Sequence, residues 1–415
     1  MRKPILAVII FLLQTLSSAA WAASIKDGRA AFNRGDFTVA LAILQPLANQ
    51  GNASAQFLVG VMHDHGKGVT KNLIEAVKWY RLAADQGITE AQFNLGNMYF
   101  TGDGVAQDYA EAVRFWRSAA SQGNASAQYH LALRYVDGKG VTKNNVEAIK
   151  WYRLAAEKGF PQAQYNLALQ YAKGTGVAQN DAEAVKWFRL AAEQGIADAQ
   201  YQLGSIYFLG RGVTQDYAEA VRYWHLAAAQ GYAAAQHNLA LRYADGYGVA
   251  QSDAEAIKWY RLAAAQGLAE AQYNLGQMYF LGRGVAQDYA EAVRYWHLAA
   301  AQGIGPAQYN LALEYAAGNI IPQNDAEAVK WYRLAAEKGI PPSSRGNLGL
   351  MYATGRGVSQ DYVRAHMWFS LGAALGDNQS SKNRAYAETL MTPQQIARAK
   401  EMARNCRLRN YVNCD

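Results

Sequence analysis

The sequence predicts an all-α protein, a solenoid in which antiparallel helix pairs stack one after another. Two observations lead to this prediction: paired aromatic residues recur every 36 residues, and each period contains two apolar stripes with helical spacing. Glycine is frequent (37 of 415 residues) and proline is scarce (8), as expected for many short helices that end at glycine. A single pair cannot bury its own apolar stripe, so neighbouring pairs must stack.

The repeat is defined by its aromatic pairs. They are Trp79-Tyr80, Phe115-Trp116, Trp151-Tyr152, Trp187-Phe188, Tyr223-Trp224, Trp259-Tyr260, Tyr295-Trp296, Trp331-Tyr332 and Trp368-Phe369. The last pair follows after 37 residues rather than 36, and the extra residue falls in a turn that contains Pro341 and Pro342. Nine units therefore fill residues 52–376.

The first helix of each unit is illustrated by residues 88–101. Ala91, Leu95 and Tyr99 recur at intervals of four residues and form one apolar stripe. Gly102 follows, and glycine is the residue that most easily takes the left-handed conformation after a helix. The pattern predicts a helix that ends at this glycine.

The second helix begins after a short loop. Asp108 is expected to cap it, and Glu111 three residues later suggests a capping box. Arg114 follows Glu111 by three residues, which predicts an ion pair on the helix surface. Trp116 lies on the apolar face, and Gly123 ends the unit.

These motifs resemble the Sel-1-like repeat, a relative of the tetratricopeptide repeat. The resemblance is carried by Ala91-Gln92, Leu95-Gly96, Tyr99, Gly102-x-Gly104, Asp108, Ala112, Phe115-Trp116, Ala119-Ala120 and Gly123. It covers about four-fifths of the chain and implies a right-handed α/α superhelix. Residues 23–51 resemble the helical hairpin that opens such proteins, and residues 377–415 are expected to form a C-terminal capping helix and tail. Thr392, followed by proline and then glutamine at the third helical position, predicts where this last helix begins.

Residues 1–22 have the pattern of a secretory signal. A basic start precedes an apolar run from Ile5 to Leu13, and Ala20-x-Ala22 is a small-residue cleavage pattern. The apolar run is about half the ~20 residues that span a bilayer, although a short membrane anchor is the alternative interpretation. We expect an exported chain, periplasmic or secreted, cleaved near Ala22 and without a transmembrane segment in its mature part.

The composition excludes a disordered or highly charged protein, because 51% of the residues are apolar and only 18% are charged. The formal net charge of +7 is small for this length and is concentrated at the two ends. It gives weak support for nucleic-acid binding, and we expect no nucleic-acid partner.

The two cysteines, Cys406 and Cys414, lie eight residues apart in the tail. In an exported chain such a pair favours a disulfide, because two ligands are too few for a zinc site.

The sequence contains none of the common catalytic motifs. It contains neither G-x-S-x-G nor H-E-x-x-H, and its Gly-x-Gly turns lack the lysine of a phosphate-binding loop. His63 and His65 are the only close histidine pair, and residues two apart on a helix face different directions. Some cysteine-rich relatives have been linked to penicillin binding or hydrolysis, but their regularly spaced cysteines are absent here. No enzyme activity, metal or cofactor is therefore expected.

The candidate binding residues are aromatic side chains of the first helices, which line the concave side in tetratricopeptide-like packing. They are Phe93, Phe100, Tyr129, Tyr165, Tyr201, Phe208, Tyr273, Phe280 and Tyr309. The tyrosine series could equally pack between repeats. Phe100, Phe208 and Phe280 are stronger candidates, because other repeats have valine or alanine at the same position.

The sequence therefore predicts a non-catalytic scaffold or adaptor of the cell envelope that binds an unidentified protein or peptide. Two alternatives remain open at this point: a cell-wall hydrolase or penicillin-binding enzyme, and a structural protein that assembles with itself.

Overall fold

The computed structural model describes residues 24–414, and all regular secondary structure within that range is helical. The prediction of an all-α solenoid is thereby confirmed. The proposed signal segment, residues 1–22, lies outside the described residues.

The helices fall into pairs that follow the 36-residue period. The first two are α2 (Ile25–Arg34) and α3 (Phe37–Asn49). The first helices of the nine repeats are α4 (Ala53–His65), α6 (Thr89–Thr101), α8 (Ala125–Asp137), α10 (Pro161–Lys173), α12 (Ala197–Leu209), α14 (Ala233–Asp245), α16 (Ala269–Leu281), α18 (Gly305–Ala317) and α20 (Ser343–Thr354). The second helices are α5 (Leu73–Asp85), α7 (Tyr109–Ser121), α9 (Asn145–Glu157), α11 (Asp181–Glu193), α13 (Tyr217–Ala229), α15 (Asp253–Ala265), α17 (Tyr289–Ala301), α19 (Asp325–Lys338) and α21 (Tyr362–Ala373). The chain continues with α22 (Asn378–Glu388) and α23 (Pro393–Leu408).

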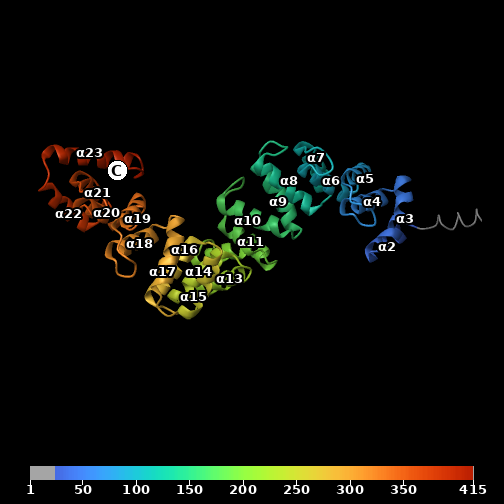
Figure 1. The fold of residues 1–415 in the computed structure, drawn as a ribbon. Helices are drawn as coiled ribbons and strands as arrows, with labels where there is room; N and C mark the ends of the chain where they lie inside the picture. The colour runs from blue at the N-terminus through green and yellow to red at the C-terminus, as the bar shows by residue number, and fades with distance from the viewer. Residues whose placement is uncertain (1–23, 415) are drawn as a thin grey trace, which may run out of the picture. The chain divides into compact units, whose positions relative to one another are not determined.

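The chain divides into two compact units. One comprises the residues up to Ala199 together with 211–213, and the other comprises 200–210 and the residues from Thr214 onward. Within each unit the two helices of a repeat pack against each other, and a second helix packs on the first helix of the next repeat, as for α7 and α8 or α15 and α16 (Figure 1). This alternation is the stacking that the repeat pattern predicts.

Small residues of the first helix receive the large aromatic side chain of the second. A Cβ atom added to Gly96 would lie 2.6 Å from Cδ1 of Trp116, which is itself almost fully buried. Gly276 faces Trp296 in the same way. The tryptophan of the second helix therefore fits because the residue that faces it on the first helix is a glycine, which has no side chain.

The helix ends follow the predicted glycines and caps, with one correction. Gly102 ends α6 with a φ of 83°, and the side chain of Asp108 accepts hydrogen bonds from the first turn of α7. The capping box expected at Asp108 does not form. The backbone N–H of Asp108 donates instead to the carbonyl oxygen of Tyr99 at 2.9 Å, and Glu111 pairs with Arg114 at 2.7 Å. The predicted ion pair is confirmed.

A buried glutamine links three consecutive helices in most repeats, a feature that the sequence analysis did not identify. Nε2 of Gln92 donates to the carbonyl oxygen of Ala84, and its Oε1 accepts from Gln122 at 2.8 Å. The same glutamine pairs are Gln56 with Gln86, Gln164 with Gln194, Gln200 with Gln230, Gln236 with Gln266 and Gln272 with Gln302. These bonds satisfy amide groups that would be costly to bury alone.

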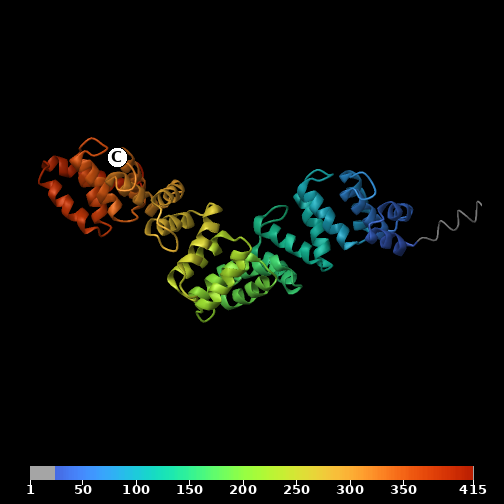
Figure 2. The same ribbon diagram turned by 60° about the horizontal axis from the view of Figure 1, so that its bottom comes forward.

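The last repeat is covered by α22 and α23, which both pack against α21 (Figure 2). The predicted start of α23 is confirmed, since Thr392 forms a complete capping box with Gln395. In this repeat Arg345 occupies the position of the buried glutamine that links the helices of other repeats. It donates to the carbonyl oxygens of Ala336 and Leu371 at 2.9 and 3.3 Å, and its guanidinium lies 3.8 Å from the ring centre of Tyr411 in the tail.

Candidate functional site

The structure offers surfaces and hollows rather than a cluster of reactive groups. Within residues 24–414 there is no group of three or more histidine, cysteine or carboxylate side chains that could hold a metal ion. In the same part of the chain, none of the helices has both the length and the apolar character needed to cross a membrane.

The tyrosine series of the first helices packs half-buried against the aromatic side chain of the second helix. Tyr165 lies 5.8 Å from Phe188, and Tyr309 lies 6.0 Å from Tyr332, measured between ring centres. Phe57, Phe93, Tyr129, Tyr201, His237 and Tyr273 are likewise half-buried. This favours the packing interpretation of the series.

The three phenylalanines predicted as binding residues each belong to an aromatic trio. The trios are Phe100 with Tyr109 and Trp116, Phe208 with Tyr217 and Trp224, and Phe280 with Tyr289 and Trp296, with ring centres 5.2–5.6 Å from that of the phenylalanine. The three phenylalanines therefore have nearly the same aromatic neighbours at nearly the same distances.

What covers these trios differs between repeats. Arg134, from the next repeat, places its guanidinium carbon 4.5 Å from the ring centre of Phe100, and Arg242 lies at the same distance from Phe208. The equivalent residue above Phe280 is Glu314. Beside Phe280 and Glu314 the structure contains a hollow of about 260 Å³.

Two of the residues that line this hollow each carry a buried polar atom without a hydrogen-bond partner among the described residues. They are Oε2 of Glu314 and the indole Nε1 of Trp296. Burial raises the pKa of the Glu314 carboxyl above its usual value, because the charged form loses hydration. The lining also includes Leu281 and Leu313, which are exposed to solvent, and the polar residues Gln277 and Asn310.

A row of exposed leucines occupies one position of the second helices. Its members are Leu82, Leu154, Leu190, Leu226, Leu262, Leu298 and Leu334, with exposed fractions between 36% and 47%. We call these residues the leucine row. The sequence contained the signal for it, because the leucines recur at multiples of 36 residues, but periodicity alone does not distinguish an exposed leucine from a buried one.

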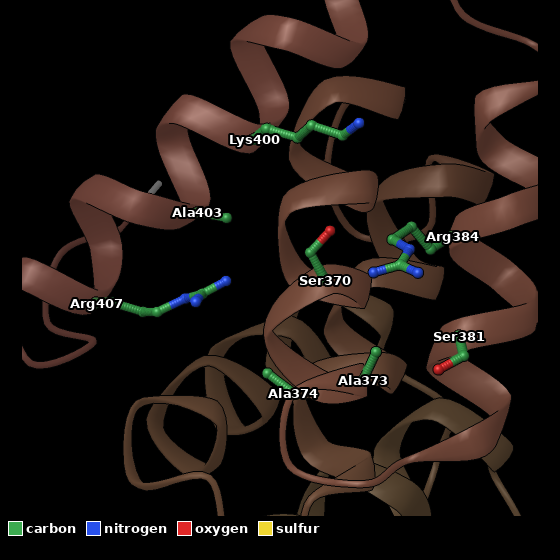
Figure 3. Close-up of a pocket in the computed structure, with 8 residues that line it drawn as sticks. All are labelled: Ser370, Ala373, Ala374, Ser381, Arg384, Lys400, Ala403 and Arg407. Carbon is green, nitrogen blue, oxygen red and sulfur yellow. The ribbon is translucent and has the colours of Figure 1, made fainter.

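A second hollow, of about 380 Å³, lies between α21, α22 and α23 near the C-terminus (Figure 3). It is lined by Ser370, Ala373, Ala374, Ser381, Arg384, Lys400, Ala403 and Arg407. Figure 3 shows the guanidinium groups of Arg384 and Arg407 pointing toward each other from opposite sides, with Ser370 between them. The arrangement presents three positive charges to one space.

The cysteines lie at the end of this region. In the structure Cys406 and Cys414 are joined by a disulfide, with Cα atoms 5.0 Å apart. The bond connects the last turn of α23, which carries Arg407, to the tail that follows.

Comparison with known proteins gives a consistent result. The family model for the Sel1 repeat matches residues 53–88, 89–124, 125–160, 161–196, 197–232, 233–268, 269–304, 305–340 and 342–377. A similar solved structure is c5321, described as a protective antigen present in uropathogenic Escherichia coli strains and displaying an SLR fold. It is 31% identical with a TM-score of 0.67, and the match covers 97% of this chain and 96% of that one. A Sel1 repeat protein from Oxalobacter formigenes is 32% identical with a TM-score of 0.60, over 80% of this chain and 93% of that one. Among curated proteins none matches.

Proposed function

Because the chain belongs to the Sel1 repeat family, we propose that it is a non-catalytic scaffold that binds a protein or peptide partner in the cell envelope or outside the cell. Sel1 repeat proteins are generally scaffolds for protein interactions. Stacked repeats hold side chains at fixed intervals, so one partner can contact several repeats at once.

The leucine row is the observation that carries this proposal. In the second unit, Leu226, Leu262, Leu298 and Leu334 occupy the same position on α13, α15, α17 and α19. Because the repeats stack, the leucines recur at regular intervals on the surface of this unit, and exposed apolar side chains arranged in this way can contact one extended partner. The fold itself does not need leucine at this position, because the second repeat has Ser118 there.

Replacing Leu226, Leu262 and Leu298 with serine should therefore weaken partner capture while leaving the helices intact. Since 41–45% of each of these leucines is exposed, burying the rest in a complex contributes about 0.6–1.4 kcal/mol per leucine, so the three substitutions together should lower capture at least tenfold. The measurement compares proteins retained from an envelope extract by the immobilised wild-type protein and by the variant, quantified by mass spectrometry. Leu390→Ser is the matched control, since Leu390 is also exposed but lies outside the row.

Two outcomes would contradict this proposal. One is equal capture by the variant with an unchanged circular dichroism spectrum. The other is concentration-dependent self-association that the leucine substitutions abolish, which would show that the row binds a second copy of the chain.

The proposed export has its own test. The charged start, apolar run and Ala20-x-Ala22 pattern support cleavage near Ala22. N-terminal sequencing of the protein from a periplasmic or culture fraction should begin near Ala23. In such an oxidising compartment Cys406 and Cys414 should resist alkylation until a reductant is added. An uncleaved amino terminus in that fraction would overturn the assignment.

A further inference from the structure

The hollow beside Phe280 is best understood from the two sites where the chain covers the same aromatic trio itself. Above Phe100, the guanidinium carbon of Arg134 lies 4.5 Å from the ring centre, and the guanidinium pairs with Asp137 at 3.1 Å. Above Phe208, Arg242 repeats this contact and pairs with Asp245 at 2.9 Å. In both places one guanidinium contacts both an aromatic ring and a carboxylate.

At Phe280 the ring is present, but both members of the arginine–aspartate pair are replaced, and the one carboxylate stands where the arginine stood. Glu314 occupies the position of the arginine, and Ala317 occupies the position of its aspartate partner. No lysine or arginine of the described residues forms an ion pair with Glu314, and its buried Oε2 accepts no hydrogen bond there. A carboxylate that is partly removed from water and unpaired is costly unless a cation joins it.

We propose that this hollow binds an arginine side chain of the partner, with the guanidinium over Phe280 and paired with Glu314. The inference rests on the proposed function, since it names what the scaffold recognises. The volume of about 260 Å³ is below the roughly 300–1,000 Å³ of small-molecule sites, which suits a single side chain. Leu281 and Leu313, which line the hollow, can contact the aliphatic part of the arginine.

Arginine fits this site better than lysine. A guanidinium is planar, stacks on aromatic rings and donates several hydrogen bonds in its plane, whereas an ammonium is compact and strongly hydrated. The chain itself places arginine over this ring in two repeats.

The test uses the capped tripeptide Leu-Arg-Leu and its citrulline counterpart, in which a neutral urea replaces the guanidinium. Saturation-transfer NMR on the full mature protein should detect binding of the arginine peptide, and the citrulline peptide should bind at least tenfold more weakly. Glu314→Gln should reduce binding about tenfold, because a buried charge pair is lost. Glu270→Gln is the control, being an exposed glutamate of α16 outside the hollow.

A second variant keeps the test independent of any loss of folding. Glu314→Arg combined with Ala317→Asp should rebuild the internal arginine cover, so the protein should melt at a higher temperature and no longer bind the peptide. The proposal is overturned if the arginine peptide does not bind, if citrulline binds equally, or if Glu314→Gln binds like the wild type. These peptides do not involve the leucine row, so failure of peptide binding would leave the scaffold function standing. Conversely, capture that does not depend on the leucine row would leave this arginine site standing.

The basic hollow near the C-terminus carries a second, independent inference. Within residues 24–414, Arg384, Lys400 and Arg407 form no ion pair. The nearby carboxylate of Glu388 is already engaged by Nε2 of His366 at 2.8 Å. That hydrogen bond, and then the charges of His366, Lys400 and Arg384, lower the pKa of Glu388.

We infer that this hollow binds a small oxyanion with two or more negative charges. Two guanidinium groups can each donate a pair of hydrogen bonds to an oxyanion, and the hydroxyls of Ser370 and Ser381 line the same space. Arg384 is half-buried, whereas Lys400 and Arg407 are exposed, so an anion from solution can reach all three charges.

Calorimetric titration of the full mature protein with pyrophosphate and with citrate, at constant ionic strength, tests this inference. Binding of either supports it, and their order of affinity distinguishes a phosphate ligand from a carboxylate one. Arg384→Gln and Lys400→Gln should each weaken binding about tenfold, whereas Arg398→Gln, an exposed arginine of α23 outside the hollow, should not. Absence of saturable binding, or an equal loss with Arg398→Gln, would overturn it.

Discussion

Gly96→Ala should destabilise the first unit, although alanine is the better helix former. Gly96 lies inside α6 with ordinary helical backbone, so propensity alone would favour alanine by about 1 kcal/mol. The added Cβ would lie 2.6 Å from Cδ1 and 2.7 Å from Nε1 of Trp116, closer than such atoms can approach. Overpacking of this kind costs about 1–3 kcal/mol, and we expect a lower melting temperature by circular dichroism.

Trp116→Tyr should suppress this effect. Repeats that have alanine opposite the aromatic pair it with a smaller ring: Ala132 with Tyr152, Ala168 with Phe188, Ala240 with Tyr260 and Ala312 with Tyr332. In a double-mutant cycle the alanine should therefore cost less in the Trp116→Tyr background than in the wild type. An alanine variant that melts higher than the wild type, or a cycle without coupling, would contradict the steric explanation.

The helices and their ends could be predicted because their signals are local and repeated nine times. Gly102 and Asp108 end and begin a helix through the backbone next to them, so the sequence of a single unit is enough to predict these helix ends. The capping box at Asp108 failed because its N–H is taken by Tyr99, a residue nine positions earlier. A motif of four residues does not contain that competitor.

The candidate site could be predicted only in part, because it depends on contacts between repeats. Phe100, Phe208 and Phe280 stand out in the sequence, since other repeats have small residues in their place. Whether an arginine covers the phenylalanine ring depends on the residue 34 positions later. This residue is Arg134 for the first ring, Arg242 for the second and Glu314 for the third. That pairing becomes visible only when the neighbouring first helices are placed side by side.

The basic hollow was missed for a related reason. Its three cations come from α22 and α23, and they are spaced irregularly along a tail that contains other basic residues as well. Composition shows that the tail is basic, but not that Arg384 and Arg407 face each other across Ser370 (Figure 3). The sequence therefore shows that the tail is positively charged, but only the fold shows which of its cations line the same hollow.

Acidification should destabilise the first unit through His130. The imidazole is half-buried between Trp116 and Phe93, with ring centres 5.1 and 5.6 Å away. Burial, and then the charge of Arg134, lower the pKa of His130 from 6.5 to about 4. Above pH 6.5 the ring is neutral in both the folded and the unfolded chain, so its titration leaves stability unchanged there.

Between pH 6.5 and about 4 the unfolded chain binds a proton that the folded chain does not, so the free energy of unfolding must fall as the pH falls. A shift of this size corresponds to about 3 kcal/mol once the pH reaches the folded pKa. His130→Asn tests the assignment, because asparagine occupies the equivalent position in most other repeats, for example Asn94 and Asn166. Melting temperatures measured from pH 7 to pH 4 should decline more steeply for the wild type than for the variant. Parallel declines would assign the acid sensitivity to other groups, of which His237 and His297 also have pKa values lowered by burial.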